Sequence, residues 1–76
     1  MQLSDYLVEV EPQPGMSLQD ALILAMKREQ ASVVLYERLG QLGGNAQSLF
    51  AALAQEESHH KRLLEAEYDE VVLTEN

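Results

Sequence analysis

Two glutamates and one histidine stand out in this sequence because their spacing suits the binding of metal ions. Glu57 and His60 lie three residues apart, a spacing that places two side chains on one face of an α-helix. Glu29 lies in a separate stretch, well before them. Carboxylate oxygens can bridge two metal ions and a neutral imidazole supplies a nitrogen ligand, so this set of side chains suits iron or manganese. The three residues are therefore candidate metal ligands.

These side chains meet only if two helices fold back on one another. Helical residues are expected from about 18 to about 42 and from about 46 to about 70, with no proline inside either range. Ser17 and Asp20 form a start that resembles a capping box, with a short acid in place of the usual Glu or Gln. The sequence therefore predicts two helices, each about 37 Å long.

A short glycine turn sets the relative height of the two helices. Gly43 and Gly44 suit the left-handed cap that ends a helix, and Asn45 can cap the next one. Such a turn predicts an antiparallel helical hairpin. Glu29 lies about 14 residues before this turn and Glu57 about 14 after it, so both stand about 21 Å from it. We therefore expect the two glutamates at the same level.

All three candidate ligands fall on apolar faces of their helices. Glu57 and His60 lie within the stripe formed by Leu49, Phe50, Leu53, Leu64, Tyr68 and Val71. Glu29 lies in the middle of the stripe formed by Leu18, Leu22, Met26, Val33 and Tyr36. Burying an unpaired carboxylate costs several kcal/mol. A bound metal ion would offset this cost and would explain why acidic residues lie on the apolar faces.

The first helix carries more apolar surface than one neighbouring helix covers. Leu24, Leu35 and Leu42 lie on one flank of its stripe, and Ile23 and Val34 lie on the other. A helix of this kind is normally buried on several sides. We therefore expect an all-α fold in which the hairpin forms a homodimer or a higher oligomer, built as a four-helix bundle. Two hairpins related by a two-fold axis supply four glutamates and two histidines, the ligand set of di-iron and di-manganese bundles.

Other interpretations of the same residues remain open at this point. Glu29 could form an ion pair with Arg28 or Lys61 at the edge of its helix. His60 could be a core histidine whose hydrogen bonds are satisfied. The alternative function is then a non-catalytic helical hairpin whose apolar flanks bind a partner.

A second Glu-x-x-His pair and a nearby tyrosine are further candidates for the site. Glu56 and His59 repeat the Glu-x-x-His spacing, but they face mostly away from the apolar stripe. Tyr36 lies two turns after Glu29 on the same face. It could hydrogen-bond a ligand carboxylate or carry a radical, or it could be an ordinary core aromatic residue.

Composition excludes several classes of protein. The chain has 76 residues, 13 acidic against 5 basic, a formal net charge of −8 and no cysteine. Disulfides and thiolate metal sites are therefore excluded. The acidic balance argues against nucleic-acid binding, which needs clustered Lys and Arg. No apolar run approaches the roughly 20 residues of a membrane span, and the first residues lack the features of a signal peptide, so we expect a cytoplasmic protein.

The chain divides into three segments. Residues 1–16 are expected to form an extended N-terminal arm, because Pro12, Pro14 and Gly15 forbid a continuing helix. Residues 17–70 form the helical hairpin, and residues 71–76 form a short C-terminal tail.

The sequence of both helices resembles that of a known superfamily. The segments AMKREQAS and LYERL, at 25–32 and 35–39, resemble a metal-ligand helix of rubrerythrin-like members of the ferritin-like superfamily. The segment LAQEESHHKRLLE, at 53–65, is similar to the Glu-x-x-His helix of these proteins. The resemblance implies that Glu29, Glu57 and His60 bind metal, with Glu29 as a bridging ligand, and that Tyr36 lies just outside the ligands.

The resemblance also implies a chemistry. Members of this group bind a non-haem di-iron centre and react with dioxygen or hydrogen peroxide, in iron oxidation, iron storage or peroxide removal. The implied cofactor is two iron ions per bundle, with manganese or zinc as alternatives.

The chain departs from the group in two ways. Only the C-terminal half of the usual four-helix chain is matched, so the chain is either a half-length protein that dimerises or a fragment of a longer one. A rubredoxin-like iron domain, which needs four cysteines, is missing. The electron donor is then external and unknown, and the choice between a ferroxidase and a peroxidase stays open.

Overall fold

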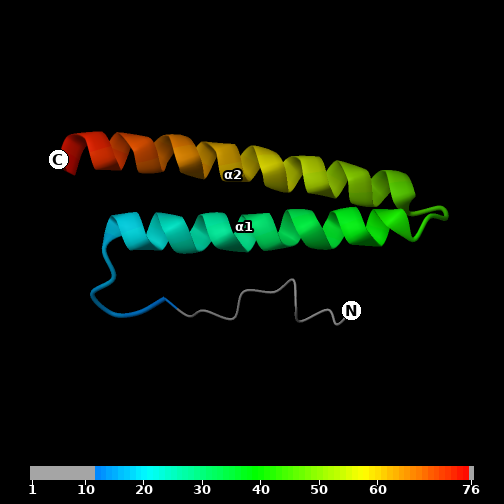
Figure 1. The fold of residues 1–76 in the computed structure, drawn as a ribbon, viewed down its shortest axis with the longest axis horizontal. Helices are drawn as coiled ribbons and strands as arrows, with labels where there is room; N and C mark the ends of the chain where they lie inside the picture. Colours follow the sequence, from blue (N-terminus) through cyan, green and yellow to red (C-terminus); the bar gives the residue numbers. More distant parts are fainter. Residues whose placement is uncertain (1–11, 76) are drawn as a thin grey trace.

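A computed structural model of the chain describes residues 12–75. Over this range the chain forms two α-helices and no strand, in the order α1 (Leu18–Gln41) and α2 (Gln47–Glu75). The helices are antiparallel, lie side by side and are joined by a short turn (Figure 1). The prediction of an all-helical hairpin is confirmed.

The start of α1 follows from its capping residue. Ser17 has extended backbone angles, and its side-chain oxygen accepts a hydrogen bond from the Asp20 amide at 3.0 Å. This bond satisfies one of the amide groups that a helix start leaves without an intrahelical partner. The Asp20 carboxylate also lies in the first turn, where the helix dipole favours negative charge. The predicted beginning of the first helix is confirmed.

The turn between the helices is made by two glycines, as predicted. Gly43 and Gly44 have φ angles of 79° and 84°, in the left-handed region that glycine adopts without steric cost. The position before α2, however, belongs to Ala46 rather than Asn45. The Ala46 carbonyl accepts the Phe50 amide at 3.0 Å, which is the first bond of the new helix. Backbone geometry therefore begins α2 one residue later than expected.

The second helix continues further than the sequence analysis predicts. Residues 71–75 were expected to lie in a tail, but they are helical and belong to α2. No proline or glycine interrupts this stretch. Val71 is buried, so packing against α1 stabilises the last turns. Residue 76 and residues 1–11 of the predicted arm lie outside the described residues.

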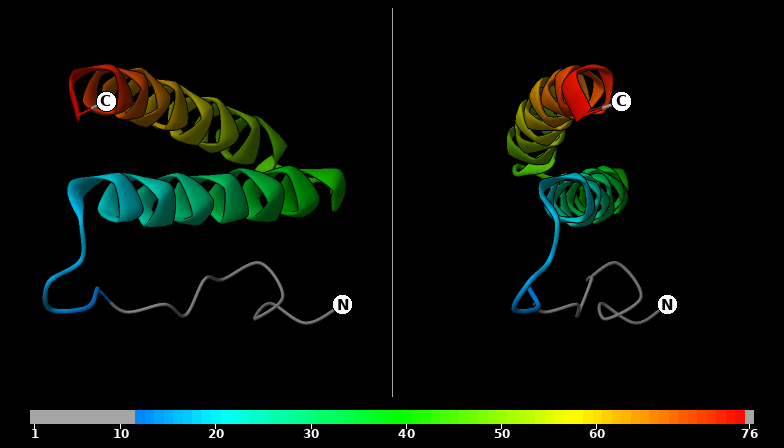
Figure 2. Two further views of the ribbon diagram at one scale, coloured as in Figure 1. Left: turned by 60° about the vertical axis from the view of Figure 1, so that its left-hand side comes forward. Right: turned by 90° about the vertical axis from the view of Figure 1, so that its left-hand side faces the viewer.

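The hairpin is a single layer of helices. The described part of the chain measures 48 × 22 × 14 Å, and 14 Å is close to the diameter of one helix with its side chains. Its buried hydrophobic residues are few, and no large side chain among the described residues is fully buried; the buried set is Leu22, Val33, Ala54 and Val71. In the right-hand view of Figure 2 the two helices are seen nearly end-on, one above the other, and no further helix of the described residues lies against either broad face. A helical layer normally buries its apolar side against a second layer.

The two broad faces of this layer differ in character. Helical spacing places Leu35 and Leu39 of α1, and Leu42 directly after its end, on the same side as Leu49 and Leu63 of α2, and we call this side the leucine face. Three of these residues are largely exposed: Leu42 by 79%, Leu49 by 58% and Leu63 by 56%. Leu49, which the sequence analysis assigns to the buried stripe, is thus open in the hairpin. Three of the five large hydrophobic residues that are exposed among the described residues thus lie on the leucine face.

The opposite side of the layer is polar near the turn. It contains a groove of about 750 Å³ beside the turn, lined mainly by polar residues that include Glu37, Gln41, Gln47, Gln55, Ser58 and Arg62. We call this side the groove face. Within residues 12–75, neither helix combines the length and apolar character that crossing a membrane requires.

Two glycines, one inside α1 and one in the turn, give a first test of the fold. Gly40 lies inside α1, where a Cβ atom would meet Phe50 Cβ at an ordinary 3.7 Å. Gly40→Ala should therefore stabilise the protein by about 0.5–1 kcal/mol, because alanine loses less backbone entropy in a helix. Gly44→Ala should destabilise it by about 1 kcal/mol, because φ is +84° there. Urea unfolding followed by circular dichroism measures both, and equal effects would contradict this backbone assignment.

Candidate metal centre

The structure brings the three candidate ligands together. Glu29, Glu57 and His60 each direct one donor atom into a common space, with all three atoms within 4.8 Å of one another. His60 Nδ1 lies 3.7 Å from Glu29 Oε2 and 3.9 Å from Glu57 Oε1. These separations exceed the 2.7–3.2 Å typical of a hydrogen bond. The imidazole is therefore too far from either carboxylate for a typical hydrogen bond, and the three donor atoms border a common space.

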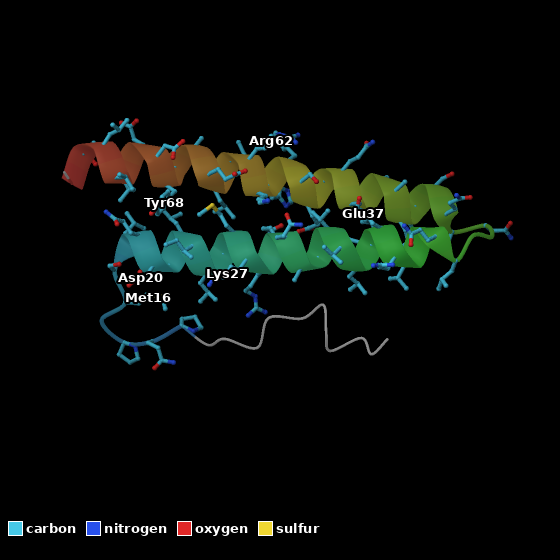
Figure 3. All side chains as sticks on the ribbon, in the orientation of Figure 1. Met16, Asp20, Lys27, Glu37, Arg62 and Tyr68 are labelled. Carbon is cyan, nitrogen blue, oxygen red and sulfur yellow. The ribbon has the colours of Figure 1, made fainter. Side chains whose placement is uncertain are left out.

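The cluster interrupts the apolar contact between the helices. Val33 and Ala54 are buried on the turn side of it, and Leu22 and Val71 are buried toward the open end. Tyr68, which belongs to the open end as well, points from α2 toward α1 (Figure 3). At the level between these two apolar regions the hairpin places two acids and an imidazole.

Glu29 is the residue whose surroundings are incomplete. Its side chain is 25% exposed, but its Oε2 atom is buried and has no hydrogen-bond partner among the described residues. A buried acceptor without a donor costs about 1–3 kcal/mol, and more when it is charged. A metal cation in the space shared with Glu57 and His60 would satisfy this atom. The carboxylate and imidazole donors therefore fit a bound transition metal.

The pKa of Glu29 reflects the same crowding. It lies above its ordinary value of 4.5, first because the Glu57 carboxyl group can share a proton with Glu29 in a hydrogen bond. Burial, which penalises the charged form, and the like charge of Glu57 raise it further, while His60 acts in the opposite direction. With both acids ionised, Glu29 Oε2 has no donor. A shared proton or a metal ion would supply the missing positive charge.

His60 is more open than the two acids. Its side chain is 52% exposed, whereas that of Glu57 is 22% exposed. Helical spacing turns His60 from the centre of the helix contact toward the leucine face. The candidate centre is thus closed between the helices and open on the leucine face.

The structure also decides between the two Glu-x-x-His registers. Glu56 and His59 are both exposed and lie outside the cluster, although the His59 ring is only 6.4 Å from that of His60. Glu57 and His60 are therefore the pair that faces α1, as predicted.

Tyr36 lies away from the cluster. Its ring stacks on Phe50 at a centroid distance of 6.3 Å, and it contributes to the groove beside the turn. Seven residues separate it from Glu29, a rise of about 10 Å along the helix. Packing against Phe50 is the contact observed for Tyr36, and its role beside a metal ligand stays a prediction.

One contact beside the cluster was missed by the sequence analysis. Lys61 Nζ donates a hydrogen bond of 2.7 Å to Gln30 Oε1, across the two helices. From the sequence, Lys61 was named as an alternative ion-pair partner for Glu29, and no partner on Gln30 was predicted. The sequence did hold one indication of this contact: Gln30 directly follows Glu29 and Lys61 directly follows His60, so the two residues are at similar heights in the hairpin.

Comparison with protein-family models, with curated proteins and with solved structures finds no match. The resemblance to rubrerythrin-like proteins therefore stays a prediction. What the structure itself supports is a helical hairpin with a Glu–Glu–His group suited to a metal ion.

The raised pKa of Glu29 predicts a pH dependence in the metal-free protein. Glu29 binds its proton more tightly when folded than when unfolded, so unfolding releases a proton as the pH rises above about 4.5. This contribution to stability is fully present at lower pH and is lost as the pH passes through the raised value. Glu29→Gln should remove the loss, so that the metal-free variant melts at a higher temperature than the unchanged protein at pH 7.

The exposed Glu56 provides the matched control. Glu56→Gln makes the same chemical change one helix position from the cluster and should leave the pH dependence of melting unchanged. Equal effects of the two substitutions would show that general surface charge, and not the Glu29–Glu57 contact, controls stability. Melting followed by circular dichroism in the presence of a chelator makes the comparison.

Proposed function

We propose that two copies of this chain form a four-helix bundle that binds a pair of iron ions and reacts with dioxygen or hydrogen peroxide. The observation that carries the proposal is the buried Glu29 Oε2 atom, which has no hydrogen-bond partner and lies 3.7 Å from His60 Nδ1. The resulting role is iron oxidation or protection against oxidants in the cytoplasm. Manganese and zinc remain alternative metals, because their ligand types overlap with those of iron.

The donor set favours a transition metal over calcium or magnesium. Calcium and magnesium take oxygen ligands almost exclusively, whereas His60 contributes a nitrogen atom to the shared space. Zinc sites with cysteine ligands are excluded by composition. Two carboxylates with one imidazole match the mixed oxygen and nitrogen ligation that suits iron.

A second copy of the chain supports the site in two ways. One hairpin offers three ligand residues, and a two-fold related hairpin adds Glu29, Glu57 and His60 once more, which gives the four glutamates and two histidines that hold a metal pair in such bundles. The leucine face supplies the contact, because it is apolar, exposed and on the side toward which His60 is turned. Burying that face also gives the single layer its missing second layer.

The residues divide the work of the proposed centre. Bound iron would supply one-electron redox chemistry for the reduction of dioxygen or peroxide. Glu29 and Glu57 neutralise the charge of the metal pair, and His60 provides a neutral ligand at the more open side. Any repeated cycle would also need an electron donor.

Metal binding is tested on protein purified from iron-supplied cells. We expect about one iron per chain by elemental analysis, since two sets of ligands hold two ions in the bundle. Glu57→Ala and His60→Ala should each lower the iron content at least tenfold. Because these variants hold little metal, a chelator should change their melting temperature little. Glu56→Ala and His59→Ala, which make the same changes one position earlier in the helix, should retain full iron content.

A chelator separates this proposal from a purely structural role of the hairpin. Stripping the metal should lower the melting temperature of the unchanged protein, because ligands that bind only the folded state stabilise it. A helical interaction module would melt at the same temperature with and without chelator. For the metal analysis above, equal iron content in Glu57→Ala and His60→Ala and in their controls Glu56→Ala and His59→Ala would contradict the proposed ligands.

The interface is tested separately, through the size of the protein in solution. Light scattering should give twice the 8.5 kDa mass of one chain, or a multiple of that dimer. Leu49→Glu places a charge in the leucine face and should convert the dimer to monomers. Leu73→Glu is the control, because Leu73 is also an exposed leucine of α2 but lies on another side of that helix. Loss of the dimer in both variants, or in neither, would contradict this assignment of the interface.

A further inference from the structure

A hydrogen bond joins the two helices next to the candidate metal centre. Lys61 Nζ donates to Gln30 Oε1 at 2.7 Å, between residues 31 positions apart in the chain. Gln30 directly follows Glu29, and Lys61 directly follows His60. Each partner of the bond is therefore the chain neighbour of a candidate ligand, one on each helix.

The bond lies on the side of the cluster opposite the leucine face. Successive residues of a helix differ by about 100° in direction, so Gln30 turns from Glu29 toward the groove face. Lys61 turns from His60 by the same angle and in the same sense. The cluster is thus open on the His60 side and bridged on the other side by the Gln30–Lys61 bond.

A hydrogen bond that lies to one side of the contact between α1 and α2 restrains rotation of each helix about its axis as well as sliding of one helix along the other. Side-chain ends lie about 5–6 Å from a helix axis, so a rotation of about 20° displaces a donor atom by about 2 Å. Metal binding tolerates much smaller errors in ligand position. The apolar contacts on either side of the cluster are non-directional and restrain such a rotation weakly, and repulsion between Glu29 and Glu57 favours it.

We propose that Gln30 and Lys61 are positioning residues of the candidate metal centre. Their hydrogen bond holds the two helices in the rotation and register at which Glu29 meets Glu57 and His60. This inference rests on the proposed metal binding and assigns a role to two residues outside the ligand set.

Because Lys61 is positively charged, a positioning role and a purely electrostatic role predict opposite effects of its removal on metal affinity. An ammonium group beside a cation site repels the metal, so removing it should strengthen metal binding if charge alone matters. A positioning role requires the opposite result. Lys61→Met should weaken binding roughly tenfold, the size of effect typical of residues that orient metal ligands.

The experiment is a titration of the metal-free 76-residue chain with Co²⁺, a spectroscopic substitute for iron, followed by visible absorbance. Lys61→Met and Gln30→Ala should each weaken binding roughly tenfold and alter the shape of the absorption bands. The exchanged pair, Gln30→Lys with Lys61→Gln, keeps one donor, one acceptor and the net charge, and should recover most of the affinity. Circular dichroism of each variant confirms that the helices are retained.

Lys27→Met is the matched control. It removes the same charge from α1 close to Glu29 in the chain, but the Lys27 side chain points away from α2 (Figure 3). Its Co²⁺ affinity should equal or slightly exceed that of the unchanged protein. Tighter or unchanged binding by Lys61→Met and Gln30→Ala would overturn the positioning role while leaving the metal site intact. Failure of the unchanged protein to bind Co²⁺ would overturn the proposed function, and this inference with it.

Discussion

The contact between Glu29 and Glu57 is the constraint on which the rest of this structure depends. Two acids that approach across a helix interface raise the pKa of Glu29 and leave its Oε2 atom without a donor. In a chain of 76 residues with so few buried side chains, such a contact opposes folding. Its presence between two apolar regions of the hairpin is physically reasonable if a cation replaces the missing donor. Among the acidic residues of the part that the structure describes, a buried carboxylate oxygen without a hydrogen-bond partner singles out Glu29, not charge alone.

The second constraint is geometric and leads to the same side of the molecule. A single layer of two helices leaves a broad face uncovered, and here the uncovered apolar face is the one that carries Leu42, Leu49 and Leu63. His60 is turned toward that face and is the most exposed of the three candidate ligands. A second hairpin on the leucine face therefore addresses the exposed leucines and the incomplete ligand set together. A partner on the groove face would address neither.

Much of the hairpin was predictable because local chemistry determines it. Ser17 begins α1 through a side-chain hydrogen bond, and Gly43 and Gly44 turn the chain through φ angles that other residues avoid. Equal distances from that turn were enough to place Glu29 beside Glu57. Residues 71–75 were assigned to a tail although no proline or glycine interrupts them, and the burial of Val71 is the tertiary contribution that periodicity up to residue 70 did not show. The Lys61–Gln30 bond was missed because it depends on the rotation of one helix about another, which periodicity alone does not give.

The position of Lys61 is a problem if the centre is considered as charge alone. A site built to hold cations gains from every nearby acid and loses from an adjacent ammonium group, yet Lys61 directly follows the candidate ligand His60. The problem disappears when orientation is considered, because a long lysine side chain can span the groove face to Gln30 while its charge is directed at an amide oxygen. A glutamate in its place would add attraction for a cation but could not donate to that amide oxygen. For a two-helix layer with little directional packing, a fixed rotation contributes more to ligand placement than one further charge does.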